Sequence, residues 1–230
     1  MTPEMITMPA HETNMWSRNG QRIEYIVLHY VGAVSTAVNN GHYYGTEPNI
    51  GASAHYFVDE HSIVASVPED MSAGHCGVDY SGGKAPFWGK CRCKNSIGIE
   101  MCCKKDAAGR WYIEPETVTR TVALVRWLMQ KHAVDADHVI RHYDVCGKIC
   151  PEPWVRDSAQ WADFQRRIRE QKSDGKRYNT VDECPVWARG AVQTLLDEGW
   201  LRGRDNGQLD LSDDMLRTLI ICGRMQGVIA

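Results

Sequence analysis

The 230-residue chain lacks a long hydrophobic run, an excess of positive charge and a secretory signal pattern. No apolar stretch approaches the roughly 18 residues of a transmembrane helix, so we expect no membrane span. The formal net charge of −3 provides no basic footprint, which argues against nucleic acid as a partner. Residues 1–20 are polar and lack the charged-then-apolar order of a signal peptide, so we expect synthesis in the cytoplasm.

The nine cysteines lack the features of a disulfide framework or a zinc knuckle. Their number is odd, and the chain is much longer than the small secreted domains that depend on disulfides. The pairs Cys91/Cys93 and Cys102/Cys103 do not show the two-residue gap of a zinc knuckle. We therefore expect most of these cysteines to be small buried or partly exposed thiols.

Strand and helix patterns occupy most of the first 170 residues. The segment 23–31 is almost continuously apolar and β-branched, which is typical of a strand covered on both faces. Further strands are expected at 52–58, 62–67, 96–101 and 139–140. Helices are expected from Ser35 or Thr36 to about Tyr44, from Pro115 to about His132, and from Trp161 to about Glu170.

A polar stretch interrupts the apolar patterning near residue 171. Residues 171–177 carry almost no apolar side chains, so they are predicted to form a linker. Two helical patterns follow, at 186–199 and 212–225. The sequence therefore predicts a domain at 1–170 and a small helical domain at 178–230.

The segment 141–151 combines a histidine, a lysine and a cysteine: His142, Lys148 and Cys150. Imidazole nitrogen and thiolate sulfur are donors that zinc prefers, and a catalytic zinc needs three protein ligands and one open position. Gly147 permits a sharp turn between the two donors. Lys148 places a cation close to whatever the metal activates. The segment predicts part of a zinc site that still requires a third ligand and a general base.

His29 is the candidate third ligand. It lies near the end of the first long strand, and open α/β sheets bind ligands at such strand ends. The alternative is an ordinary core histidine with a satisfied hydrogen bond. The presence of His142 and Cys150 elsewhere in the chain favours metal ligation.

Glu100 is the candidate general base. In the strand 96–101, Ile97, Ile99 and Met101 share one face, and Glu100 lies on the other face with Gly98. A carboxylate on an otherwise buried strand requires a partner or a function. The alternative is a structural salt bridge to Lys104 or Lys105.

The stretch 68–95 is rich in Gly, Ser, Lys and Pro and is too long for a simple connection. Loops of this length commonly form the rim of a functional site. His75 and Trp88 are therefore candidate substrate-binding residues. The equal alternative is that both side chains merely face solvent.

With these residues in view, the chain resembles the zinc-dependent N-acetylmuramoyl-L-alanine amidases that phages and prophages produce as endolysins, which are related to peptidoglycan recognition proteins. The likeness lies in four stretches, which occur in the family's order between about residues 20 and 155. They are 25–30, 53–56, 95–100 and 141–151, the last including both His142 and Cys150.

The resemblance implies a zinc ion held by His29, His142 and Cys150, with Glu100 and Lys148 as catalytic residues beside it. It implies an α/β fold with a central mixed, mostly parallel β-sheet flanked by helices. The implied partner is bacterial peptidoglycan, whose N-acetylmuramic acid–L-alanine amide bond would be cleaved by zinc-activated water. Such a protein, made in the cytoplasm, would act on the cell wall after release.

One position departs from part of the family. Some members carry a catalytic tyrosine directly before the histidine of the second matching stretch, and here that residue is Ala54. We therefore expect the acid–base work to fall on Glu100. His55 matches a family histidine and is expected to support the site or to contact substrate, without binding the metal.

The tail resembles one S-layer-homology-like unit at 181–188, 195–203 and 211–212. This likeness implies wall attachment or self-association of the C-terminal domain, without deciding between them.

Other functions remain open. A non-catalytic peptidoglycan-binding protein would keep the cleft, although such relatives lack the cysteine that is present here as Cys150. A structural zinc site would need His55, His75 or Cys146 as a fourth ligand. A Cys–His protease is disfavoured because Cys150 precedes a proline and accompanies two donors of the metal-binding type. A bacterial autolysin would share the chemistry of an endolysin.

Overall fold

The computed structural model describes residues 2–170 and 176–229. The chain divides into two compact units, Met1–Glu170 and Gln171–Ala230. Of the predicted linker at 171–177, residues 171–175 lie outside the described residues.

The first unit is built on a mixed, mostly parallel sheet with the strand order β1-β5-β4-β7-β3-β9, and β8 pairs with β7. The long central strands β3 and β7 are parallel, and β9 and β4 continue the parallel arrangement on either side. The antiparallel pairs are β4 with β5 and β7 with β8. The bounds are β1 Ile6–Thr7, β3 Tyr25–Val34, β4 Tyr56–Val58, β5 Ile63–Ala65, β7 Ser96–Lys105, β8 Trp111–Tyr112 and β9 Val139–Arg141.

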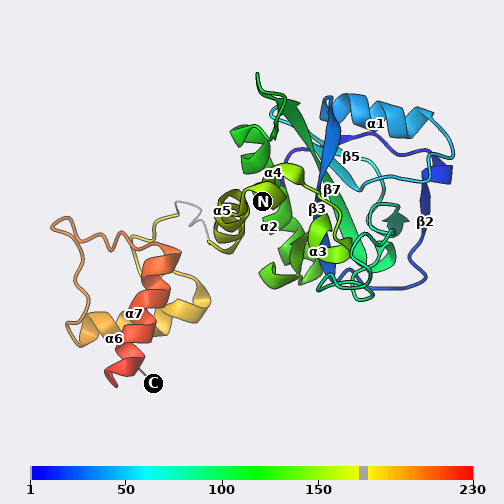
Figure 1. Ribbon diagram of the computed structural model, residues 1–230. Helices are drawn as coiled ribbons and strands as arrows, with labels where there is room; N and C mark the ends of the chain where they lie inside the picture. The colour runs from blue at the N-terminus through cyan, green and yellow to red at the C-terminus, as the bar shows by residue number, and fades with distance from the viewer. Residues whose placement is uncertain (1, 171–175, 230) are drawn as a thin grey trace. The chain divides into compact units, whose positions relative to one another are not determined.

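Helices cover both faces of this sheet, as Figure 1 shows, with α1 on one side and α2 and α5 on the other. One core packs Leu28 and Ile99 of the sheet against Leu124 of α2 and Phe164 of α5. The opposite face of the sheet packs against α1. The bounds are α1 Ala37–Thr46, α2 Pro115–His132, α3 His142–Cys146, α4 Glu152–Arg156 and α5 Ser158–Arg169. The predicted fold class is therefore confirmed.

Individual elements agree with the sequence patterns to different degrees. The helix predicted at 115–132 has those bounds, with Pro115 in its first turn. The α1 helix is capped by Thr36, whose side chain accepts a hydrogen bond from the Asn39 amide. The strand predicted at 52–58 is shorter, because Ser53 and Ala54 bond to loop segments instead of a ladder and β4 begins only at Tyr56.

Short elements complete the first unit. The strands β2 (Met15–Ser17) and β6 (Met71–Ala73) pair antiparallel in a separate small sheet. Three 3-10 helices, η1 Glu12–Asn14, η2 Cys93–Asn95 and η3 Ala136–His138, precede β2, β7 and β9. The η2 turn leads directly into β7, and η3 leads directly into β9.

The second unit packs α6 (Val186–Asp197) against α7 (Asp213–Met225). Its apolar core includes Val192, Leu195 and Leu216. Tyr178 pairs with Leu211 in an isolated antiparallel bridge that joins the start of the unit to the segment before α7. Both helices occupy the segments in which the sequence predicts helices.

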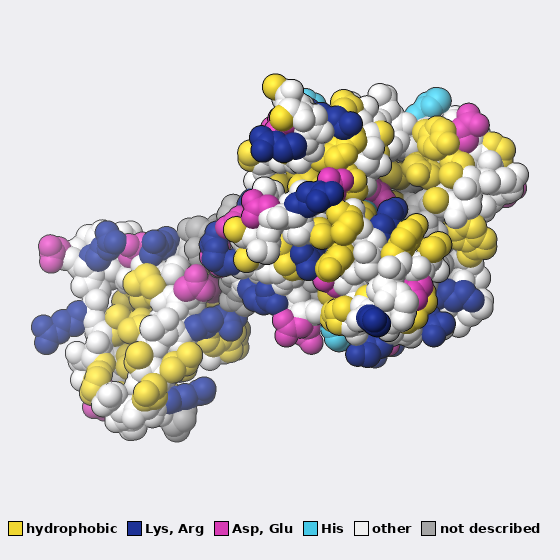
Figure 2. Space-filling model, in the orientation of Figure 1, with side chains coloured by type: hydrophobic (Ala, Val, Ile, Leu, Met, Phe, Trp, Pro, Cys, Tyr) yellow, Lys and Arg dark blue, Asp and Glu magenta, His cyan; other side chains and the backbone are white. Residues whose placement is uncertain are grey.

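Two surface properties bear on partners. Among the described residues, no helix combines the length and hydrophobicity that crossing a bilayer requires. On the face shown in Figure 2, Lys and Arg side chains are interspersed with Asp and Glu side chains. Interspersed charges of both signs are typical of an ordinary water-exposed surface.

Candidate metal centre

The two central strands place His29 beside Glu100. In the parallel pair β3/β7, His29 is in register with Glu100. Since side chains alternate along a strand, Leu28 and Ile99 point into the core while His29 and Glu100 point to the other face. His29 Nδ1 lies 3.9 Å from Glu100 Oε1.

A short helix and a turn bring His142 and Cys150 to the same place. His142 begins α3, directly after β9, and α3 ends at Gly147, whose φ of 82° suits glycine. The Tyr143 amide then donates to the Cys150 carbonyl at 2.9 Å, which folds the loop back. As a result, Cys150 Sγ lies 3.7 Å from His29 Nδ1, and the His29 and His142 ring centroids are 4.5 Å apart.

These three side chains fit a metal ion. One ligand atom from each of His29, His142 and Cys150 lies within 4.8 Å of the other two, and all three residues are buried. Both ring nitrogens of His142 are buried and have no hydrogen-bond partner among the described residues. Buried polar atoms without partners are costly, so this pair of nitrogens fits a metal-binding role. Two imidazoles and one thiolate form a donor set that suits zinc.

Protonation of the cluster is consistent with ligation. Burial holds the pKa of His29 well below its usual value, and the neighbouring His142 lowers it further. Burial, with a contribution from Lys148, lowers the pKa of His142 to about 4. Both rings are therefore neutral near pH 7, which is the form that binds a metal. Burial raises the pKa of the Cys150 thiol, so metal binding must displace its proton.

Glu100 has no structural partner of the kind that would explain its burial. Its Oε2 is buried without a hydrogen-bond partner among the described residues. Burial raises the pKa of Glu100 to about 8, opposed by the positive charge of Lys148. Lys104, one alternative partner, instead pairs with Glu60 at 2.5 Å and Glu114 at 3.1 Å.

The other alternative partner of Glu100, Lys105, lies 4.4 Å from the centroid of the Trp111 ring. Neither lysine therefore explains the burial of Glu100. Lys148 is exposed on the loop between α3 and Cys150. Its positive charge contributes to lowering the pKa values of His29, His142 and Glu100, so the lysine lies near all three groups.

His55 and His75 both lie beside β7, in different roles. His55 is fully buried, its Nδ1 accepts from the Gly98 amide at 2.9 Å, and its Nε2 lies 3.2 Å from the Met71 carbonyl oxygen. These contacts engage both ring nitrogens of His55 inside the protein. His75 contacts His29 directly, with 3.1 Å between His75 Nδ1 and His29 Nε2. The sequence pattern predicts a substrate contact at His75 and does not indicate this bond.

The stretch 68–95, predicted as one long loop, includes the strand β6 and the η2 turn, and the loop between them packs against the segment that carries His142 and Cys150. The Tyr80 amide donates to the Cys146 carbonyl at 2.7 Å, and the Phe87 amide donates to the Asp144 carbonyl at 3.1 Å. Trp88, in the same loop, remains 36% exposed. The loop is therefore held against α3 by backbone hydrogen bonds, and the substrate contact at Trp88 stays a prediction.

A second group of metal-type donors lies behind the first. Ligand atoms of His75, Cys76 and Cys93 also lie within 4.8 Å of one another. The two sulfur atoms are 3.8 Å apart, and both cysteines are free. The spacing of Cys91 and Cys93 gives only a weak signal of a second metal site, and the structure instead groups Cys93 of η2 with the adjacent residues His75 and Cys76.

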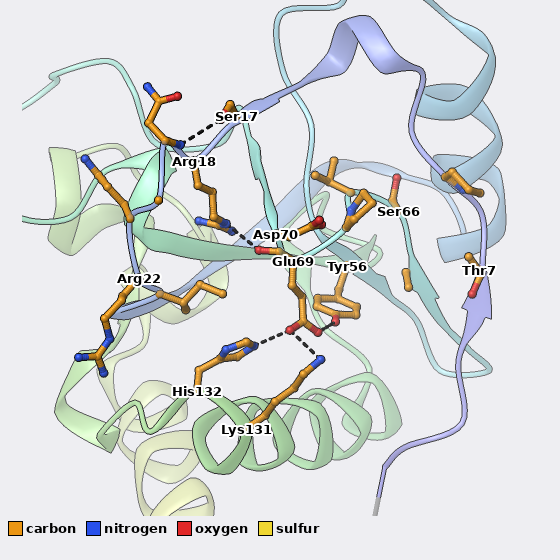
Figure 3. Close-up of a pocket in the computed structure, with 18 residues that line it drawn as sticks. Thr7, Ser17, Arg18, Arg22, Tyr56, Ser66, Glu69, Asp70, Lys131 and His132 are labelled. Atoms are coloured by element: carbon orange, nitrogen blue, oxygen red, sulfur yellow. Dashed lines mark hydrogen bonds and ion pairs between the residues drawn. The ribbon is translucent and has the colours of Figure 1, made fainter.

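A separate cavity of about 940 Å³ lies among the N-terminal arm, β4 and the end of α2 (Figure 3). Its wall includes Glu69, whose carboxylate accepts hydrogen bonds from Tyr56, Lys131 and His132. None of the candidate metal ligands lines this cavity. Because no candidate ligand lines it, the cavity is distinct from the metal centre.

A family model described as N-acetylmuramoyl-L-alanine amidase matches residues 19–153. A probable N-acetylmuramoyl-L-alanine amidase from Bacillus licheniformis is 34% identical over 164 residues, which cover 68% of this chain and 45% of the relative. The N-acetylmuramoyl-L-alanine amidase BlyA from Bacillus subtilis (strain 168) is 32% identical over 171 residues, covering 70% and 46%. The chain thus spans about half the length of these curated relatives.

Solved structures share the fold at low sequence identity. The structure of PlyL superposes with a TM-score of 0.58 at 20% identity, covering 73% of this chain and 98% of that chain. A selenomethionine derivative of AmpD gives a TM-score of 0.55 at 20% identity, covering 73% and 96%. The first unit therefore has the PlyL and AmpD fold.

Proposed function

The chain belongs to the N-acetylmuramoyl-L-alanine amidase family, and from that membership we propose that it hydrolyses the amide bond between N-acetylmuramic acid and L-alanine in bacterial peptidoglycan. It would act on the wall after release from the cytoplasm, as an endolysin or as an autolysin of the same chemistry. The observation that carries the proposal is the buried donor set of His29, His142 and Cys150 with Glu100 beside it, whose Oε2 has no hydrogen-bond partner among the described residues.

His29, His142 and Cys150 would hold one zinc ion. A zinc ion bound there supplies Lewis-acid chemistry, which makes water a better nucleophile and polarises the substrate carbonyl. Two neutral imidazoles and one thiolate carry a combined charge of −1, so the loaded site keeps a net positive charge.

Glu100 would act first as the general base and then as the general acid. Its Oε2 accepts a proton from the attacking water and returns it to the nitrogen of the leaving L-alanine. This role requires the ionised carboxylate at the start of the cycle. Burial disfavours that form in the metal-free chain, and a positive charge a few ångströms away favours it. Metal loading and activation of the base are therefore coupled.

Lys148 would stabilise the negative charge that develops on the carbonyl oxygen of the substrate. We expect Lys148→Ala to lower kcat by about 10²–10³-fold with zinc content unchanged, because only an interaction with the transition state is lost. Lys105→Ala, a change of another exposed lysine, serves as the control and should leave kcat unchanged. Turnover of Lys148→Ala equal to that of the wild type would remove Lys148 from the mechanism.

Digestion of purified cell walls by the full chain tests the proposed activity. We expect new L-alanine amino termini to appear, to stop when a zinc chelator removes the metal, and to return when zinc is added back. Labelling of free amino groups followed by acid hydrolysis identifies the new terminus. Binding to walls without new termini would instead support a non-catalytic recognition protein, and release of reducing sugar ends would indicate a glycosidase.

We propose that residues 178–230 form a domain for wall attachment or self-association. The unit has its own apolar core. It also exposes large apolar side chains, among them Trp187 at 54% and Trp200 at 58%. Exposed aromatic side chains are typical of binding surfaces.

A further inference from the structure

A chain of hydrogen bonds runs from His29 to the protein backbone on the side of the ring away from Cys150. His29 Nε2 lies 3.1 Å from His75 Nδ1. His75 Nε2 lies 3.1 Å from Ser96 Oγ, and the Ser96 hydroxyl is 2.7 Å from the Arg92 carbonyl oxygen. These hydrogen bonds thus join His29, a candidate metal ligand on β3, to the η2 turn that leads into β7.

The donor and acceptor at each of these hydrogen bonds determine which ring nitrogen of His75 and of His29 carries the proton. A carbonyl oxygen only accepts, so the single hydroxyl proton of Ser96 is directed at Arg92. Ser96 Oγ must then accept a hydrogen bond from His75 Nε2–H, which leaves a lone pair on Nδ1 of the neutral His75 ring. That lone pair accepts from His29 Nε2–H. His29 Nδ1 is therefore unprotonated, and it is the nitrogen 3.7 Å from Cys150 Sγ.

We propose that His75 is a positioning residue that fixes the tautomer and orientation of His29, so that the Nδ1 lone pair faces the metal position. The inference rests on the zinc site of the proposed function. Partners of the second ring nitrogen commonly set the tautomer and basicity of a metal-binding histidine. Here that partner is another imidazole, fixed in turn by Ser96.

The space that holds the His75 ring against His29 depends on Gly98. A Cβ atom on Gly98 would lie 2.6 Å from His75 Cγ and 2.9 Å from His75 Nδ1. Only glycine on β7 leaves room for the ring at this position. The ring stands at 90° to that of His29, with 5.1 Å between centroids. The space that the His75 ring occupies thus explains why β7 carries a glycine at this position, in register with Val27 of β3.

The same histidine belongs to the group His75, Cys76 and Cys93, whose donor atoms would suit a second metal ion. If His75 Nε2 bound a metal, the remaining ring proton would lie on Nδ1. His29 Nε2 would then have to accept a hydrogen bond from His75 Nδ1–H, and the neutral His29 ring would carry its own proton on Nδ1. The first metal position would lose a ligand. With neutral rings, His75 can either support metal binding by His29 or bind a second metal through Nε2, but not both. The hydrogen bond from His75 to the Ser96 hydroxyl favours support of His29.

Zinc affinity of the full chain, measured by competition with a chromophoric chelator, tests the proposal. We expect His75→Leu to weaken zinc binding by about 10–100-fold. His75→Asn places an amide oxygen near the position of Nδ1 and should recover most of the loss. Cys93→Ser is the matched control, because its sulfur contacts Cys76 in the second group of donors and is not a link between His29, His75 and Ser96. Its affinity and a stoichiometry of about one zinc per chain should be unchanged.

Long-range proton–nitrogen NMR of the wild-type imidazoles gives a second readout. We expect His29 to carry its proton on Nε2 before and after zinc binding, and Ser96→Ala to mix the tautomers of His75. Protonation of His29 at Nδ1 in the metal-free chain, unchanged affinity of His75→Leu, or a second zinc ion lost in His75→Leu would each overturn the proposal. The wild-type and Ser96→Ala spectra decide the matter if His75→Leu does not fold. Wild-type cleavage without zinc would instead overturn the proposed metal chemistry.

Discussion

Cys150→Ser is expected to lower zinc content from about one ion per chain to near zero and to abolish wall hydrolysis in the same step. Serine keeps the size of the side chain, but its hydroxyl is a poor zinc donor at neutral pH, whereas thiolate is among the donors that zinc prefers. A catalytic metal supplies several kcal/mol of transition-state stabilisation. Since each 1.36 kcal/mol is tenfold in rate, the loss should be at least about 10³-fold. Elemental analysis and release of L-alanine termini, measured on the same preparation, check both effects.

Cys146→Ser is the matched control for this experiment. Cys146 is also fully buried and lies four residues away, and its Sγ contacts the His142 carbonyl oxygen at 3.5 Å. A serine hydroxyl can keep that bond, so zinc and activity should remain. Loss of zinc in Cys146→Ser would identify a fourth protein ligand and a structural site. Stoichiometric zinc and full activity in Cys150→Ser would remove the sulfur from the metal centre.

The architecture of the first unit follows from local pattern to a large extent. The α2 helix has both a proline in its first turn and a continuous apolar stripe, so its bounds agree with the prediction. The long strand β3 is predicted to be covered on both faces, and two separate cores confirm this, one with Ile26 and Leu28 and the other with Tyr25 and Val27. The pairing of β2 with β6 escaped prediction, because each strand has only three residues and their partnership depends on how distant loops fold.

The donor atoms of the site were easier to predict than its supporting contacts. His29 and Glu100 are indicated by their positions on otherwise apolar strands, and Cys150 is indicated by its spacing from His142. The bond between His75 and His29 spans 46 positions and depends on the path of a loop without periodicity. Gly98 was the available signal, because a glycine inside a buried strand indicates the close approach of another group.

Glu100→Gln is expected to lower kcat by about 10²–10⁴-fold while zinc content stays near one ion per chain. The amide has the shape of the carboxylate but cannot take up the proton of the attacking water. The wild-type rate should rise with pH as Glu100 ionises, and this rise should disappear in Glu100→Gln. Single-turnover rates across pH, paired with zinc analysis, measure both effects. Loss of zinc from Glu100→Gln would make Glu100 a structural or ligating residue.

Glu100→Gln is expected to lower activity but to raise the stability of the metal-free chain, because the pKa of Glu100 is raised. Because burial lifts this pKa from its usual value of 4.5 to about 8 in the folded chain, the unfolded chain loses its proton first as pH increases. The metal-free wild type therefore loses stability between these two pH values. The side chain is 22% exposed, so solvent limits the size of the effect. Urea unfolding of metal-free protein should show Glu100→Gln more stable than the wild type at pH 8 and the two equal near pH 4. An equal midpoint at pH 8 would mean that burial does not destabilise the charged base, and the coupling between metal loading and base activation would fail with it.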